Sequence, residues 1–248
     1  MHKRNFIISV LILLSIIISS CSTSKKIVKV EKPKVKVEEK LKPVFIKNLD
    51  FEERNFIKSE KINSIDKIKF VYDSRNKLTG GVKTSKIIYD KDGFMTEMDF
   101  LNQNGKVDQS YKYQYDKNGF RIETIRYDNT GKPDKRYTYE YNKYGNKIKA
   151  TRYNITGKME KYYLYKYDVN GNLIDDLWYD ADGKLEYKII YQYDSNGNKI
   201  EAISYSNDGD LISQSKFKYG PNDKIIEEDL FDKDGNPTGV IQYVYKYY

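Results

Sequence analysis

Glycine spacing constrains this chain more than any other feature of its sequence. From residue 93 onward, glycines alternate 12 and 14 residues apart, so the full period is 26 residues. The turn glycines are Gly93, Gly105, Gly119, Gly131, Gly145, Gly157, Gly171, Gly183, Gly197, Gly209 and Gly235, and Asp223 takes one glycine slot. An aromatic residue lies four positions before each slot, except at Leu101. A fixed period of this length predicts a repeat architecture.

The residues around each glycine predict a tight β-hairpin. In the segment 115–119, Tyr-Asp-Lys-Asn-Gly, Asp116 opens a type I turn in which its carboxylate caps backbone N–H groups, and it pairs with Phe120. Gly119 then adopts the left-handed conformation and forms a bulge that closes a three-residue loop. The runs between turns are about 8 to 10 residues long and rich in Tyr, Ile, Thr and Val. The sequence therefore predicts an all-β antiparallel meander of about fourteen strands.

Strand alternation places every second residue on the same face of the predicted sheet. On this basis Tyr115 lies opposite Arg121, and Tyr113 lies opposite Glu123. One face then gathers columns of tyrosine together with cations, which we expect to lie against the aromatic rings. The candidate binding residues on this face are Tyr113, Tyr139, Tyr165, Tyr191, Arg121, Lys147 and Lys199.

The opposite face carries an isoleucine column among Thr, Lys, Gln and Glu. Its members are Ile122, Ile148, Ile174, Ile200 and Ile226. Leu173 and Ile225 fill the slot that holds a cation in other repeats, so the tyrosine face is not uniform either. We therefore expect a thin, curled or twisted open sheet, stabilised by cross-strand pairs and by contacts between neighbouring repeats.

Three segments carry a family resemblance. Residues 165–174 (Tyr-Lys-Tyr-Asp-Val-Asn-Gly-Asn-Leu-Ile) and 191–200 resemble the YD repeats of the RHS family, and 139–148 does so with Asn for Asp. The resemblance spans residues 66–248 and implies β-hairpin repeats that build spiralling sheets, in shells around toxins or in cell-surface and adhesion domains. Because this short chain has no large extra domain as cargo, we do not expect an encapsulating shell.

The amino terminus predicts export and lipid anchoring. A basic start precedes an apolar run from Phe6 to Ile18, which is too short for a comfortable membrane span, so residues 1–20 are predicted to be a signal peptide. The ending Ile-Ser-Ser-Cys resembles the bacterial lipobox, which implies that Cys21 is acylated and anchors the protein in the cell envelope, at the outer membrane. The alternative is a free thiol at Cys21 after an ordinary signal peptide.

A lysine-rich tether is predicted over residues 21–43, and its stretch 25–43 carries eight Lys and three Glu. The chain's positive charge is concentrated there, so we expect no nucleic-acid surface on the sheet. These lysines serve either solubility or contact with anionic lipid or cell-wall polymer. Residues 44–65 are expected to cap the array, as a short amphipathic helix or an opening strand pair, before the repeat domain at 66–248.

The residue types of most enzyme sites are missing beyond the signal segment. The sole histidine is His2 and the sole cysteine is Cys21, which excludes histidine-based acid–base pairs, triads and ligands. Segments such as 90–93 resemble part of a calcium loop, but the glycine position and distal Glu of an EF-hand are not matched. Glu227 and Glu228 point to opposite faces of a strand, which does not suit a glycosidase pair. We expect no catalysis, no cofactor and no metal.

Two function classes remain. In the first, the tyrosine face is a binding or adhesion module for a glycan, a cell-wall polymer or a surface protein, because tyrosine combines a rigid ring with a polar tip. In the second, the tyrosines only pack the sheet, and the protein is a structural envelope scaffold. Solvent-open tyrosine columns in a groove favour binding, whereas columns covered by neighbouring side chains favour the scaffold. The other predicted partner is the lipid bilayer, reached through Cys21.

Overall fold

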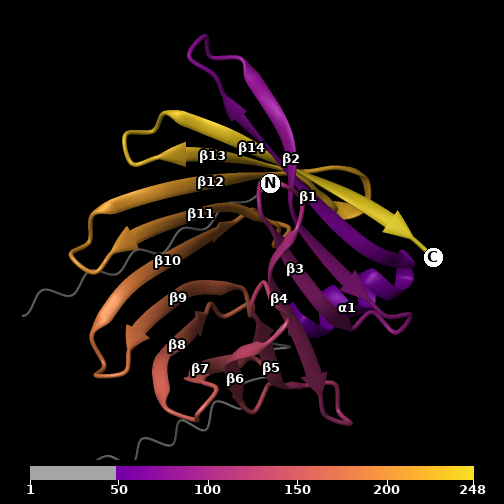
Figure 1. The fold of residues 1–248 in the computed structure, drawn as a ribbon, viewed down its shortest axis with the longest axis vertical. Coiled ribbons are helices and arrows are strands. Elements are labelled where there is room, and N and C mark those ends of the chain that lie inside the picture. The colour runs from indigo at the N-terminus through magenta and orange to yellow at the C-terminus, as the bar shows by residue number, and fades with distance from the viewer. Residues whose placement is uncertain (1–48) are drawn as a thin grey trace, which may run out of the picture. The chain divides into compact units, whose positions relative to one another are not determined.

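The computed structural model describes residues 49–248, which form one α-helix followed by fourteen β-strands (Figure 1). The predicted signal peptide, the Cys21 anchor and the tether lie outside the described residues. The elements are α1 (Leu49–Ser59), β1 (Ile62–Tyr72), β2 (Leu78–Tyr89), β3 (Met95–Leu101), β4 (Val107–Tyr115), β5 (Arg121–Tyr127), β6 (Pro133–Tyr141), β7 (Lys147–Asn154), β8 (Met159–Tyr167), β9 (Leu173–Asp180), β10 (Leu185–Tyr193), β11 (Lys199–Ser206), β12 (Leu211–Tyr219), β13 (Ile225–Asp232) and β14 (Pro237–Tyr247).

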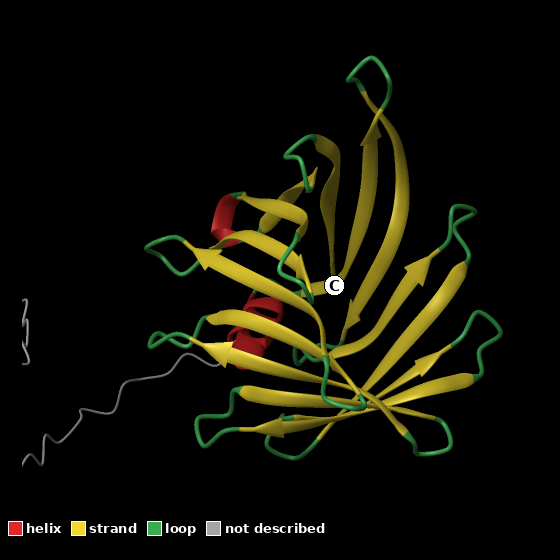
Figure 2. Cartoon of the chain, turned by 90° about the vertical axis from the view of Figure 1, so that its left-hand side faces the viewer, coloured by secondary structure: helices red, strands yellow, loops and turns green. Residues whose placement is uncertain are grey.

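The strands form a closed antiparallel barrel. Each strand pairs with its neighbours in sequence, and β1 also pairs with β14, as in the register Ile65 to Tyr245. Figures 1 and 2 show the barrel from two directions, with hairpin turns at both strand ends. The predicted all-β meander of about fourteen strands is confirmed, whereas the predicted open sheet is wrong. Closure satisfies the N–H and C=O groups that an open sheet exposes along its two edge strands.

The hairpin turns follow directly from the local sequence. Between β4 and β5, Asp116 N donates to Phe120 O at 2.8 Å, and Gly119 N donates to Asp116 O at 3.0 Å. The Asp116 carboxylate accepts the backbone N–H groups of Asn118 and Phe120 at 2.8 and 2.9 Å. All eleven predicted turn glycines have positive φ, between 72° and 89°. In the slot where Asp223 replaces glycine, its φ is 53°, and the preceding Asn222 is left-handed as well (φ 60°).

The strand register differs from the prediction by one residue beyond each turn. Tyr115 pairs with Arg121 as expected, but the next pair is Gln114 with Glu123, so Ile122 is an extra residue in a β-bulge. Every hairpin from β2–β3 to β13–β14 contains such a shift. Because a bulge bends its strand and increases the local twist, a bulge in each hairpin curves the sheet until it closes.

The bulges also correct one expectation about which residues face each other. Tyr113 lies opposite Thr124, so the prediction that it faces Glu123 is wrong. All five members of the isoleucine column are bulge residues, and Ile122 and Ile226 keep 48% and 44% of their surface exposed. The isoleucine column therefore marks the points of strong curvature and lies on the outside of the barrel.

Helix α1 covers the barrel end that carries the β2–β3 and β4–β5 turns. Ile57 of α1 is fully buried with Ile62, Ile65, Ile87 and Tyr89, and this cluster is the main apolar core. Ion pairs fix both sides of the last helical turn, where Lys58 meets Asp92 at 2.8 Å and Glu60 meets Lys224 at 2.5 Å. Residues 49–65 thus hold the helix and the start of β1. Within residues 49–248, no helix is long and apolar enough to span a membrane.

Candidate functional site in the barrel interior

The tyrosine face lines the inside of the barrel. Five of the predicted residues border one cavity of about 280 Å³, namely Tyr113, Tyr139, Tyr165, Arg121 and Lys147. Each of these tyrosines pairs across the ladder with a shorter residue. Tyr113 pairs with Thr124, Tyr139 with Ala150 and Tyr165 with Asp176. The small side chains of Thr124 and Ala150 leave the space that the cavity occupies, beside the rings of the tyrosines.

The remaining two predicted residues lie on another part of the interior wall. Lys199 borders a second cavity of about 370 Å³ beneath α1, together with Lys67 and Glu53. Its Nζ lies 4.2 Å from the ring centroid of Phe217 and 5.4 Å from that of Tyr191. The structure therefore places all seven candidate residues on the interior face of the barrel, but five border one cavity, Lys199 borders the other, and Tyr191 lies beside Lys199.

The interior cations lie against ring faces, as the sequence predicts. Arg121 Cζ is 4.4 Å from the Tyr113 centroid, and Lys147 Nζ is 4.8 Å from the Tyr165 centroid. Burial lowers the pKa of Lys147 and of Lys199, because the charged ammonium loses water. Within residues 49–248, neither these lysines nor Arg121 forms an ion pair with a carboxylate. Cation–aromatic contacts, worth about 0.5–2 kcal/mol each, are thus their main partners.

Asp176 of β9 is the acid of the 280 Å³ cavity, and sequence reasoning missed it as a site residue. Burial raises its pKa to about 6, and the nearby Trp178 N–H and Lys147 charge offset part of that rise. Yet Asp176 Oδ1, Trp178 Nε1 and Arg121 Nε are all buried without a hydrogen bond of normal geometry. Buried polar atoms are almost always paired with protein or ordered water. Asp176 and Trp178 thus have at best each other as partners, and these incompletely paired polar groups around one cavity indicate a place for a polar ligand.

Six aromatic rings form a continuous row on the interior wall, here named the aromatic track. Its members are Phe100, Tyr111, Tyr137, Tyr163, Trp178 and Tyr187, and successive centroids lie 5.1–6.5 Å apart. These spacings are typical of interacting ring pairs. Phe100, at one end of the track, keeps 40% of its surface exposed, so the track reaches solvent. Four members border the 280 Å³ cavity, which therefore opens along a wall of aromatic rings.

A different set of tyrosines has a structural role. Six tyrosines at the α1 end, one in each 26-residue period from Tyr115 onward, donate their hydroxyls to the backbone carbonyl 20 residues earlier, at 2.7–3.0 Å. These residues are Tyr115, Tyr141, Tyr167, Tyr193, Tyr219 and Tyr245. Each such bond joins one repeat to the one before it. Tyr113 and Tyr165, two positions earlier in their strands, form no hydroxyl hydrogen bond within residues 49–248.

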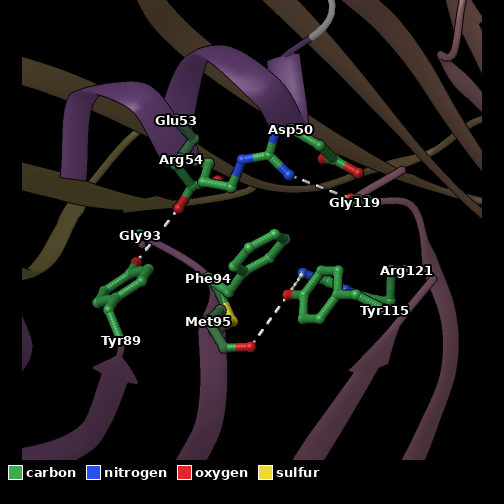
Figure 3. A pocket seen from close by; sticks show the side chains of 10 residues that line it. All are labelled: Asp50, Glu53, Arg54, Tyr89, Gly93, Phe94, Met95, Tyr115, Gly119 and Arg121. Atoms are coloured by element: carbon green, nitrogen blue, oxygen red, sulfur yellow. Dashed lines mark hydrogen bonds between the residues drawn. The ribbon is translucent and has the colours of Figure 1, made fainter. Parts of the chain in front are cut away.

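The junction between α1 and the barrel is tightly packed (Figure 3). Tyr89 donates its hydroxyl to Glu53 Oε1 at 3.2 Å, and Arg54 Nη1 donates to Gly119 O at 3.4 Å. The Arg54 guanidinium also lies 4.6 Å from the Phe94 centroid, and burial raises the pKa of Glu53. The free space here is about 30 Å³, enough for water but not for an organic ligand. This junction therefore holds α1 in place and is not a binding site.

Comparisons with known proteins give no family for this chain. No family model matches it, and no curated protein matches it either. Among solved structures, a porin-like protein from Bacteroides uniformis is similar at 12% identity and a TM-score of 0.42, covering 75% of this chain and 98% of that one. The Photorhabdus luminescens Tc holotoxin pore is similar at 12% identity and a TM-score of 0.32, covering 73% of this chain and 11% of that one. At these scores the likenesses assign no function.

Proposed function

We propose that this protein is a cell-envelope lipoprotein with YD-like repeats, whose barrel interior is a non-catalytic binding site for a glycan. Acylated Cys21 anchors it, at the outer membrane, and the lysine-rich tether separates the barrel from the lipid. The observation that carries the binding proposal is the aromatic track beside a cavity with incompletely paired polar groups. Sugar rings stack on aromatic faces while their hydroxyls need fixed donors and acceptors, and this interior offers both.

The interior position of the tyrosines favours a glycan over a surface protein. A folded partner cannot reach ring faces that line the inside of a closed barrel. The cavity that Tyr113, Tyr139 and Tyr165 line, at about 280 Å³, is close to the lower end of the range of about 300–1,000 Å³ for small-ligand pockets. A short saccharide, or the end of a longer chain entering along the aromatic track, matches this space.

The scaffold alternative is supported by the hydroxyl bonds that join successive repeats, but it leaves the cavity residues unexplained. A purely structural barrel gains nothing from a buried Asp176 that has no ion pair within residues 49–248 and at best the Trp178 N–H as a partner, because burying an incompletely paired charge lowers stability. Such costs are typical of functional sites, where stability is lower than the fold allows. We therefore assign the turn tyrosines to the scaffold and the cavity tyrosines to binding.

The test uses the chain's single tryptophan, Trp178, which borders the cavity and reports on its occupancy by fluorescence. We expect envelope saccharides to change this signal, and Tyr139→Ala and Tyr165→Ala each to weaken binding by roughly 1–3 kcal/mol. The control is Tyr153→Ala, whose ring packs on Arg136 at 4.7 Å and is not a cavity residue. If the cavity variants lower the melting temperature and no saccharide changes the Trp178 signal, the scaffold alternative is correct.

A further inference from the structure

We infer that the saccharide bound in the barrel is an acidic one, with its carboxylate between Arg121 and Lys147 and its hydroxyls at Asp176 and Trp178. The inference rests on the proposed function and names the class of its ligand. It depends on three features of the cavity, which are its unpaired cations, its incompletely paired hydrogen-bonding groups and the apolar residues that other repeats place in the cation slot.

The two cations flank one ring, and within residues 49–248 no carboxylate lies within ion-pair distance of either. Arg121 Cζ lies 5.9 Å and Lys147 Nζ lies 5.7 Å from the centroid of Tyr139, so the two charges lie on either side of it. The charged groups that act on Lys147 are Arg121, Asp176 and the α1 carboxylates Asp50 and Glu53. None of these acids lies within ion-pair distance of Lys147 or Arg121. A ligand carboxylate between the cations supplies the missing charge and keeps the ring face available for stacking.

The cation slot does not need a charge for the barrel to form. Following the 26-residue period, the slot holds Met95, Arg121, Lys147, Leu173, Lys199 and Ile225. In three of six repeats an apolar residue begins the strand after the turn and pairs with the aromatic residue before the turn, just as Lys147 pairs with Tyr141. A buried ammonium lowers stability relative to these apolar residues, so its presence in the cavity indicates a binding role.

The opposite side of the cavity supplies a matched acceptor and donor. Asp176 and Trp178 both line the cavity, and alternate residues on β9 bring them to the same interior face, where each has at best the other as a partner. Neighbouring hydroxyls of a sugar ring can donate to the carboxylate and accept from the indole N–H. Inorganic phosphate has no neighbouring hydroxyls on a ring, which distinguishes it from a uronic or muramic acid.

The experiment compares matched sugars on the full chain in detergent, with Trp178 fluorescence as the readout. The pairs are glucuronic acid with glucose, galacturonic acid with galactose, and N-acetylmuramic acid with N-acetylglucosamine. We expect the acidic member of at least one pair to bind ten-fold or more tightly than its neutral partner, with a preference that weakens as salt rises. Inorganic phosphate is the control anion, because it has no hydroxyl groups arranged on a ring. We expect it to compete poorly with the acidic sugars.

The matched variants separate charge in the cavity from charge elsewhere. Lys147→Leu places in the cavity the residue that the same slot holds at position 173, and we expect it to abolish the preference for acid. Lys149→Leu is the control, because Lys149 faces outward and pairs with Glu140 at 3.1 Å, and we expect it to keep that preference. Lys147→Gln is a second neutral variant, and the melting curves of both Lys147 variants verify that the barrel is folded.

The outcomes distinguish this inference from the function on which it rests. Equal binding of acidic and neutral sugars, still sensitive to Tyr139→Ala, overturns the acidic ligand and leaves glycan binding standing. A preference for acid that persists in both Lys147→Leu and Lys147→Gln also overturns it. If no sugar changes the Trp178 signal, the proposed function and the inference fail together.

Discussion

The buried carboxyl group of Asp176 makes the stability of this barrel depend on pH in an unusual direction. Burial raises its pKa from an ordinary 3.8 to about 6. Since one pKa unit corresponds to about 1.36 kcal/mol, the ionised carboxylate lowers the free energy of unfolding by at most about 3 kcal/mol at neutral pH. Water in the cavity reduces this effect, so we expect Asp176→Asn to stabilise the barrel by about 1–3 kcal/mol at pH 7.5.

The sign follows from proton linkage. Between about pH 4 and pH 6 the folded barrel holds the Asp176 proton more often than the unfolded chain does. The contribution of Asp176 to stability therefore falls as pH rises through this window, and the destabilisation is complete above it. Turn carboxylates such as Asp194 act in the opposite direction, because backbone hydrogen bonds lower their pKa. Only the difference between the wild-type protein and the Asn variant isolates Asp176.

The measurement is chemical denaturation of both proteins from pH 4 to pH 8. We expect the stability difference to be largest at pH 7.5 and to vanish near pH 4, where both side chains are neutral. The matched control is Asp175→Asn, because Asp175 is the adjacent residue but faces outward, 3.5 Å from Lys188. An Asn variant at 176 that is no more stable at pH 7.5, or a difference that does not change with pH, would refute the burial argument.

Two further predictions follow from the geometry of the turns and tyrosines, and a third concerns the predicted lipid anchor. Gly93→Ala should destabilise the barrel by several kcal/mol more than Gly105→Ala, which thermal melts of both variants measure. The Cβ of an alanine at position 93 would lie 2.2 Å from a backbone oxygen of α1, whereas a Cβ at position 105 would meet open space. Tyr141→Phe should cost about 1 kcal/mol through its lost hydroxyl bond, and Tyr165→Phe should melt like the wild type. Cys21→Ala should lose incorporation of a fatty-acid probe, and unchanged labelling would contradict the anchor.

The strands and turns were predictable because their physical causes are local. A five-residue segment such as 115–119 contains both the carboxylate that caps the turn and the glycine that takes the left-handed conformation. Closure was not predictable in this way. It requires β1 to meet β14, with Ile65 opposite Tyr245, and it depends on the curvature that twelve successive bulges accumulate. No short segment specifies this accumulated curvature. The isoleucine at each α1-end bulge from β4–β5 onward is nevertheless a sequence feature that indicates it.

The candidate site was predictable only in part. Tyrosines and cations gather on one face because strand alternation requires it, and that face is the barrel interior. The acids were missed because each is a single departure from its column. In the 26-residue series the residues opposite Tyr113, Tyr139, Tyr165, Tyr191 and Phe217 are Thr124, Ala150, Asp176, Ala202 and Glu228. Two acids in a column of small residues are the signal that identifies this position.

The β-bulge explains how one repeat provides both a scaffold and a site. In β7 the extra residue Ile148 lies outside, so Lys147 and Ala150 both face the interior although they are three residues apart. Lys147 then lies opposite Tyr141, whose hydroxyl is fixed to the preceding repeat, while Ala150 lies opposite Tyr139 and leaves space beside its ring. Without the bulge, strict alternation would place Lys147 and Ala150 on opposite faces. The residue that curves the sheet is therefore also the one that brings a cation and a free aromatic face into the same cavity.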